Sequence, residues 1–124
     1  MKIGAQVYVK GSVEAAEMYC RAFGAEVSFN IKDDNGAYAH SELRINGEFF
    51  MCVSEYGLFT ENVSEQSQLT MAFNVPGLGS EEAVRKAHSI LSEGGKTLHL
   101  GARHWSDFCA DIVDKFGVFW WIAI

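Results

Sequence analysis

A repeated arrangement of strands and glycine-containing turns constrains this sequence more than any single motif does. Residues 105–124 hold two strand-like runs on either side of a turn that ends at Gly117, and the second run is apolar on both faces, which suits a buried strand. Residues 38–54 show the same arrangement, with Gly47 in the place of Gly117. Two copies of one unit in a chain of 124 residues predict a fold with an internal repeat.

The first unit reads as a strand, a helix and three further strands. Residues 3–9 alternate apolar and polar side chains, which is typical of a strand with one buried face. A helix is expected to begin at the N-cap Ser12 and to end at Gly24, because apolar residues recur between them at helical spacing. Strands are expected at residues 26–32 and on both sides of Asn46-Gly47, a dipeptide that favours a type I′ hairpin turn.

The second unit repeats this order. Residues 68–75 alternate like the first strand, and a helix capped by Ser80 follows them. Gly94-Gly95 ends this helix, and residues 96–102 supply a strand that leads into the closing hairpin. The pattern predicts the α+β class with two tandem βαβββ units.

The length supports one domain, because 124 residues can bury one core but not two independent ones. We predict a single domain over residues 1–124, with unit one at 1–54, a polar linker at 55–67 and unit two at 68–124.

Charge and composition argue against several kinds of partner. The net charge of -6 and the pI near 5.1 oppose binding to nucleic acid or to an anionic membrane, and no apolar run approaches membrane-spanning length. No basic leader followed by an apolar run precedes the first strand, so we expect a cytoplasmic protein. Cys20, Cys52 and Cys109 are odd in number and widely spaced, and we expect each to face a helix or the core rather than act as a nucleophile.

Four blocks spread over almost the whole chain resemble the vicinal oxygen chelate superfamily, which includes glyoxalases, extradiol dioxygenases and bleomycin-resistance proteins. Within it the chain is most similar to the PhnB-like branch. The resemblance implies that the two units curl into a cup with the helices outside and the ligand inside, and that the protein is a homodimer. The blocks are residues 14–19 with 22–27, residues 39–43 with Asn46-Gly47, residues 91–96 and residues 114–120.

If the fold is a cup, strand alternation predicts which side chains face the ligand. The turn at Asn46-Gly47 would pair Ile45 with Glu48, which places one set of hairpin residues in the cup and packs Leu43, Phe50 and Cys52 under the helix. Because the turn at residues 114–117 is longer, the alternation does not decide which face of the sheet Asp114 occupies. The predicted ligand-binding residues are Gln6, Tyr8, His40, Glu42, Arg44, Phe49, Met51, Thr70 and Trp121.

Enzymes of the superfamily bind a divalent metal through His and Glu, one ligand coming from the first and the last strand of each unit. By position, the metal-ligand slots of this chain fall on Gly4 or Gln6, Met51, Thr70 and Trp121. Such a metal needs oxygen or nitrogen ligands, which the thioether of Met51 and the indole of Trp121 do not supply. We therefore expect no metal and no cofactor.

Three functional interpretations stay open on the sequence. The first is a metal-free protein that binds a small molecule, as bleomycin-resistance proteins do. The second is an enzyme, either an acid/base catalyst using His40 and Glu42, or a metal-dependent lyase, isomerase or dioxygenase whose ligands have moved, with His99 and His104 joining His40. The third is an interaction module without a ligand.

Overall fold

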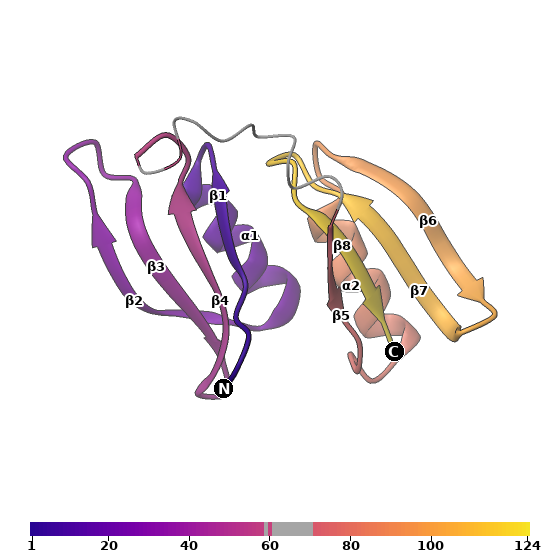
Figure 1. Cartoon of the computed structure of the whole chain (residues 1–124). Coiled ribbons are helices and arrows are strands. Elements are labelled where there is room, and N and C mark those ends of the chain that lie inside the picture. Colours follow the sequence, from indigo (N-terminus) through magenta and orange to yellow (C-terminus); the bar gives the residue numbers. More distant parts are fainter. Residues whose placement is uncertain (59, 61–70) are drawn as a thin grey trace. The chain divides into compact units, whose positions relative to one another are not determined.

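The computed structural model describes residues 1–58, 60 and 71–124, and the chain divides into two compact units, Met1–Glu65 and Gln66–Ile124 (Figure 1). Each unit carries one helix and one four-stranded sheet, so the α+β class and the order of strand, helix and three strands are confirmed. Within the described ranges, no helix has the length and apolar character that crossing a membrane would require.

The described residues of unit one form β1 (Gln6–Val9), α1 (Ser12–Phe23), β2 (Glu26–Lys32), β3 (Tyr38–Ile45) and β4 (Glu48–Glu55). The strands form sheet A in the order β1-β4-β3-β2, with β1 parallel to β4 and the other pairs antiparallel. Helix α1 packs on one face of sheet A (Figure 1). We call the face of each sheet that is turned away from its helix the distal face.

The ends of α1 depend on two glycines and one carboxylate. Gly11, and not Ser12 as predicted, is the N-cap, and its φ of 89° lies in the left-handed region that favours glycine. Glu55 accepts hydrogen bonds from the backbone N–H groups of Gly11 and Ser12 at 3.1 and 3.0 Å. The hydroxyl of Ser12 instead accepts from the Tyr38 N–H at 2.9 Å, which ties the helix to β3. Gly24 ends α1 in the left-handed conformation, as predicted.

The core of unit one lies between α1 and sheet A. Val7 and Val9 of β1 are buried, and so are Ala15 and Tyr19 of α1. Ile3, which the alternation placed on the same buried face, is fully exposed because β1 begins only at Gln6.

Unit two has the elements β5 (Ala72–Val75), α2 (Glu81–Leu91), β6 (Lys96–Arg103), β7 (Ser106–Val113) and β8 (Phe119–Ala123). Its strands form sheet B in the order β5-β8-β7-β6, with β5 parallel to β8 (Figure 1). Ser80 caps α2 as predicted, since its hydroxyl accepts from the Ala83 N–H at 3.1 Å. Side chains of β8 differ in burial from one residue to the next, because Trp120 and Ile122 are buried whereas Phe119 and Trp121 are half-buried.

Asp114 stabilises the turn between β7 and β8 from inside the core. Its Oδ1 accepts from the N–H groups of Phe116 and Val118 at 2.9 and 3.0 Å, and its Oδ2 accepts from Trp120 Nε1 at 2.9 Å. The sequence left open which face of the sheet Asp114 occupies. The structure places Asp114 on the core face, because the three donors hold its carboxylate beside the buried indole of Trp120.

Candidate functional site

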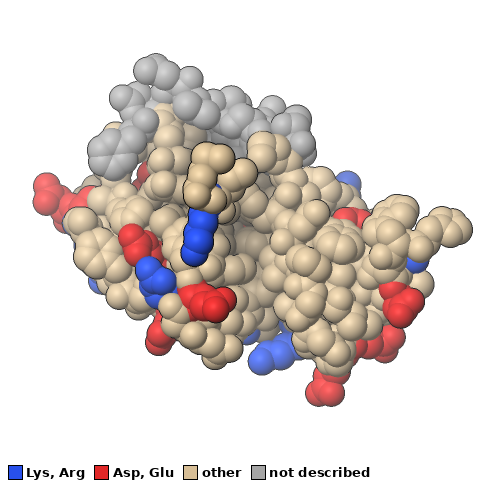
Figure 2. All heavy atoms as spheres, turned by 60° about the horizontal axis from the view of Figure 1, so that its bottom comes forward, with Lys and Arg blue, Asp and Glu red and all other residues tan. Residues whose placement is uncertain are grey.

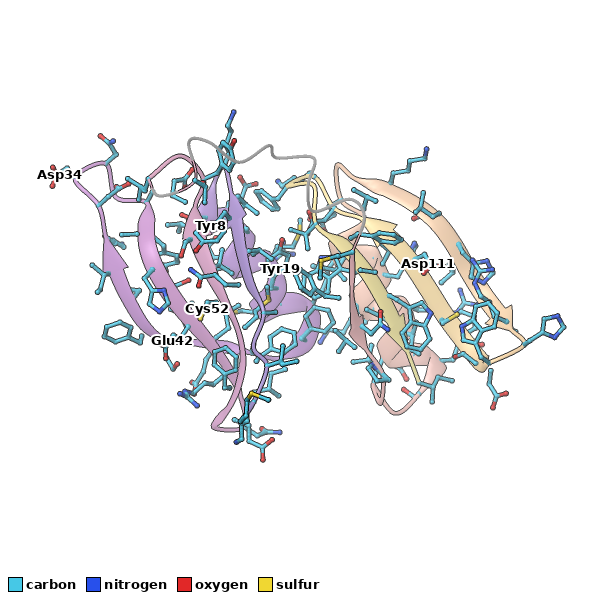
Figure 3. The ribbon with its side chains drawn as sticks, in the orientation of Figure 1. Tyr8, Tyr19, Asp34, Glu42, Cys52 and Asp111 are labelled. Atoms are coloured by element: carbon cyan, nitrogen blue, oxygen red, sulfur yellow. The ribbon has the colours of Figure 1, made fainter. Side chains whose placement is uncertain are left out.

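The distal face of sheet A carries most of the predicted ligand-binding residues. Gln6 and Tyr8 alternate with the buried Val7 and Val9, so they lie on the distal face of β1. The side-chain amide of Gln6 donates to Ser54 Oγ on the neighbouring strand β4 at 3.0 Å. Side chains of β1, β3 and β4 thus share one surface (Figure 3).

Three side chains of β3 form a chain of contacts on this face. His40 Nε2 lies 3.2 Å from Glu42 Oε2, and the other oxygen of that carboxylate lies 3.8 Å from Arg44 Nη2. The three occupy alternate positions of one strand, so their side chains emerge on the same side, as predicted. Each keeps about a third of its side-chain surface exposed (33%, 32% and 37%), so the group is accessible from solvent.

The turn between β3 and β4 is confirmed, but a bulge beyond it changes the pattern of β4. Asn46 and Gly47 both have positive φ, at 51° and 81°, and Ile45 pairs with Glu48, as a type I′ turn requires. The register then shifts, because Arg44 pairs with Phe49 whereas Leu43 pairs with Met51.

The residue left without a partner at this bulge is Phe50. Its ring lies 5.2 Å from that of Phe23 on α1, which places it on the helix side of sheet A. An extra residue in one strand reverses the alternation that follows it.

The bulge corrects two sequence-based placements. Met51, predicted to face the ligand, is 2% exposed and packs with Leu43 in the core. Cys52, predicted to pack under the helix, lies on the distal face, where it pairs with Gln6 on one side and Glu42 on the other. Figure 3 labels Glu42 and Cys52 on these neighbouring strands.

The Cys52 thiol is held in its protonated form by its surroundings. Burial raises the pKa of Cys52 above its ordinary value, and the negative charge of Glu42 raises this pKa further. The thiol therefore offers a weak hydrogen-bond donor and a soft apolar surface rather than a ready nucleophile.

Phe49 lies beside a hollow at the end of sheet A. Its ring is 44% exposed, and a Cβ built on Gly4 would meet this ring at 3.0 Å, so the backbone at Gly4 lies flat against it. The hollow has a volume of about 550 Å³ and combines cationic, anionic and apolar groups. Its lining residues are Lys2, Ile3, Gly4, Arg44, Glu48 and Phe49.

Strand pairing places four residues in a row across each distal face. We call them row A, which is Gln6, Cys52, Glu42 and Phe29 on β1, β4, β3 and β2, and row B, which is Asn74, Trp121, Asp111 and His99 on β5, β8, β7 and β6.

The two rows correspond position by position, because both units have the same strand order. In each row the first residue carries an amide, the third carries a carboxylate and the fourth carries a ring. Each carboxylate also has an arginine partner, at 3.8 Å for Glu42 and Arg44 and at 2.9 Å for Asp111 and Arg103.

Row B contains a polar atom whose hydrogen bond is missing. Among the described residues, Trp121 Nε1 is the one buried side-chain nitrogen or oxygen without a hydrogen-bond partner. Leaving a buried donor unpaired costs about 1–3 kcal/mol. The neighbouring indole shows the usual solution, because Trp120 Nε1 donates to Asp114.

Three further predicted residues complete the comparison. Thr70, the remaining ligand-binding prediction, is outside the described residues. His99, a member of row B, has its Nε2 3.2 Å from the carbonyl oxygen of Gly101, and His104 is exposed beside Trp105 in a hollow at the turn after β6.

The residues at the superfamily's metal positions do not match its ligands. In unit one the bulge puts the thiol of Cys52 in place of Met51, beside the amide of Gln6. In unit two the expected positions are Trp121, which carries an indole, and Thr70, which is outside the described residues. Throughout the part of the chain that the structure describes, no group of three or more His, Cys, Asp or Glu side chains could hold a metal ion. The amide of Gln6, the thiol of Cys52 and the indole of Trp121 are not the His and Glu ligands that the resemblance implies.

Sequence reasoning missed Cys52 and Asp111 as residues of the distal faces. Asp111 alternates correctly with its buried neighbours, so comparison of the two units strand by strand would have found it. Cys52 carried no such signal, because the bulge at Phe50 has no marker in the sequence.

Comparison with known proteins identifies the fold. No family model and no curated protein sequence matches the chain. Among solved structures, a PhnB protein from Bacillus cereus, described as a putative 3-demethylubiquinone-9 3-methyltransferase, is 22% identical with a TM-score of 0.79, over 99% of this chain and 98% of that one. A possible glyoxalase from Bacillus cereus is 20% identical with a TM-score of 0.67, over 100% and 99%.

A variant of the fosfomycin resistance protein FosX from Listeria monocytogenes, solved with Mn(II) and a dihydroxypropylphosphonic acid, is 15% identical with a TM-score of 0.72. The match covers 99% of this chain and 90% of that one. At these identities the likeness concerns the fold.

Proposed function

We propose that this protein, which has the vicinal oxygen chelate fold, binds a small molecule without a bound metal. The observation that carries the proposal is the group of His40, Glu42 and Arg44 on the distal face of sheet A, which is accessible and adjoins an aromatic hollow. Ligand sites combine apolar and aromatic surface with a few placed polar groups, and this face has both.

The chemistry at the superfamily's metal positions supports the metal-free part of the proposal. FosX was solved with Mn(II), whereas the corresponding strands here present amides, a thiol and an indole. A binding role needs no metal, and the aromatic and polar groups of the distal faces remain available to a ligand.

The proposed binding residues are those of the sequence analysis with Met51 replaced by Cys52. The hydrogen-bond donors and acceptors of His40, Glu42 and Arg44 would orient the ligand, and the ring of Phe49 would cover its apolar part. Isolated charges of both signs on a mostly uncharged surface, visible in Figure 2, suit a ligand of low net charge better than nucleic acid. We place the protein in the cytoplasm. The complete set is Gln6, Tyr8, His40, Glu42, Arg44, Phe49, Cys52, Thr70 and Trp121.

Elemental analysis of untagged protein purified without chelator tests the metal-free part. We expect no stoichiometric transition metal. We also expect that added divalent metals leave the unfolding midpoint unchanged, because only a metal that binds the folded state would raise it. Stoichiometric nickel, zinc, iron or manganese would contradict the proposal and support a metal-dependent lyase, isomerase or dioxygenase.

A thermal-shift screen with variants tests the binding face. Compounds that raise the unfolding midpoint should lose this effect in Glu42→Gln and in Arg44→Met, but not in the control Arg85→Met, which changes an exposed arginine of α2. Shifts that persist in both distal-face variants would place the ligand elsewhere.

A metal-free acid/base enzyme is the second candidate, favoured by the 3.2 Å contact between His40 and Glu42. In this case a substrate found by the screen would be consumed, and His40→Ala combined with Glu42→Gln would abolish turnover. Unchanged turnover in the double variant would remove both residues from catalysis.

A further inference from the structure

We propose that row B binds the part of a ligand that carries an uncharged hydrogen-bond acceptor, such as a ketone, ester or amide carbonyl, and that Trp121 Nε1 donates to this oxygen. The inference rests on the proposed small-molecule function and specifies the chemistry of the ligand. It concerns unit two, whereas the group that carries the proposed function belongs to unit one.

The unpaired indole N–H is the first observation. Trp120 and Trp121 are consecutive residues of β8 whose side chains lie on opposite faces of sheet B. Trp120 donates to Asp114 inside the core, whereas Trp121 Nε1 is equally buried and has no acceptor among the described residues. A buried donor is normally paired with a protein group or with ordered water, and in the proposed complex a bound molecule supplies this acceptor.

The neighbours of Trp121 decide the charge of that molecule. Asp111 is its partner on β7, and Arg103 Nη2 already donates to the Asp111 carboxylate at 2.9 Å. The guanidinium of Arg103 also stacks over Trp105, 5.5 Å from the ring centroid. Because Asp111 and Arg103 neutralise each other, Arg103 is not left over for an anionic ligand, and a neutral oxygen is the acceptor that we assign to Trp121.

The other side of the row supplies a second polar group. Asn74 is the partner of Trp121 on β5, and its exposed side chain can donate or accept a hydrogen bond. Between these two polar ends, the indole of Trp121 offers a flat apolar surface. A planar molecule with a carbonyl group matches this combination.

The indole N–H signals of the full chain, recorded in ¹⁵N–¹H NMR spectra, provide the test. The chain has three tryptophans: Trp105 is exposed, Trp120 donates to Asp114, and Trp121 has no acceptor in the part of the chain that the structure describes. Acetophenone is the acceptor probe, and α-methylstyrene, in which CH₂ replaces the carbonyl oxygen, is its matched control. We expect acetophenone to move the Trp121 N–H proton signal downfield and to leave that of Trp120 in place, while α-methylstyrene produces no downfield shift.

Two variants complete the design. Trp121→Phe identifies the Trp121 signal, keeps an aromatic ring and removes the N–H, so acetophenone should bind about fivefold more weakly, as expected for one lost hydrogen bond. Trp105→Phe is the control and should leave the affinity unchanged. The acetophenone methyl signal reports the affinity in both.

Other outcomes overturn the inference. They are a Trp121 signal that acetophenone does not move up to its solubility limit, equal shifts with both probes, or rapid exchange showing that the N–H is bonded to water only. Asp34→Ala, an exposed change outside the proposed site, should leave the Trp121 shift intact. If the shift fails while the thermal-shift screen still depends on Glu42 and Arg44, this inference is wrong and the proposed function stands.

Discussion

Cys52 and Glu42 are cross-strand partners on the distal face of sheet A, and this neighbourhood sets the reactivity of the thiol. Burial and the charge of Glu42 both raise the pKa of Cys52, so little thiolate is present at neutral pH. We expect slow alkylation of Cys52 by iodoacetamide, and faster alkylation in Glu42→Gln because loss of the negative charge lowers the pKa. Peptide mass spectrometry across a pH series measures both rates.

Cys20 is the internal control for this experiment. Its pKa is raised by burial and by the charges of Glu17 and Glu26, none of which changes in Glu42→Gln. Its alkylation rate should therefore be the same in both proteins. Equal rates for Cys52 with and without the Glu42 charge would show that burial alone controls this thiol.

Loss of the Asp114 side chain should remove three hydrogen bonds from unit two. Its carboxylate accepts from two backbone N–H groups and from Trp120 Nε1, and it is 3% exposed. We expect Asp114→Ala to lower the free energy of unfolding by about 3 kcal/mol, because three donors lose a charged acceptor. Urea unfolding measures the change, and the exposed Asp34→Ala should stay within about 0.5 kcal/mol of the parent.

At the scale of elements, His88 joins α2 to β6. Its Nε2 lies 2.8 Å from Thr97 Oγ1, and burial, followed by the positive charge of Arg85, lowers its pKa below the ordinary value of 6.5. The folded state therefore favours the neutral imidazole. The contribution of His88 to stability is present above pH 6.5 and is lost as the pH falls through the lowered pKa.

Replacing His88 by Gln tests this linkage, because an amide can still bond Thr97 but does not titrate. The parent should lose more stability than His88→Gln when the pH is lowered from 7.5 to 5, since only the parent takes up a proton at this position on unfolding. Denaturant unfolding at several pH values gives the two slopes. Parallel slopes would contradict the lowered pKa.

At the scale of the whole molecule, apolar side chains remain exposed on the edge strands of both sheets. Phe29 and Ile31 of β2 are 48% and 54% exposed, and Leu98 of β6 is 48% exposed. Edge strands with apolar side chains favour association, and the homodimer expected from the resemblance would cover such residues.

Light scattering after size-exclusion chromatography should give a mass twice the 13.7 kDa of one chain. Combined Phe29→Ser and Ile31→Ser should weaken the dimer at least tenfold if β2 contributes to the interface, because two exposed apolar side chains lose their burial. Lys32→Ser on the same strand is the control. A monomer at every concentration would rule out the dimer.

Local patterns in the sequence determined the elements and their order. The alternation of Val7 and Val9 with Gln6 and Tyr8, the glycine at position 24 and the cap at Ser80 depend on neighbours within a few residues. So does the type I′ turn at Asn46-Gly47. The convergence of His40, Glu42 and Arg44 on one face followed from the same alternation, because residues two apart on a strand point the same way.

Tertiary structure decided the positions that depend on pairing between distant segments. The bulge at Phe50 places its ring against Phe23 of α1, Met51 in the core and Cys52 on the distal face. Likewise, Trp120 Nε1 pairs with Asp114, whereas Trp121 Nε1 has no acceptor among the described residues. Neither strand register nor a side-chain hydrogen bond leaves a periodic trace in the chain, so these features became visible only when the strands were paired.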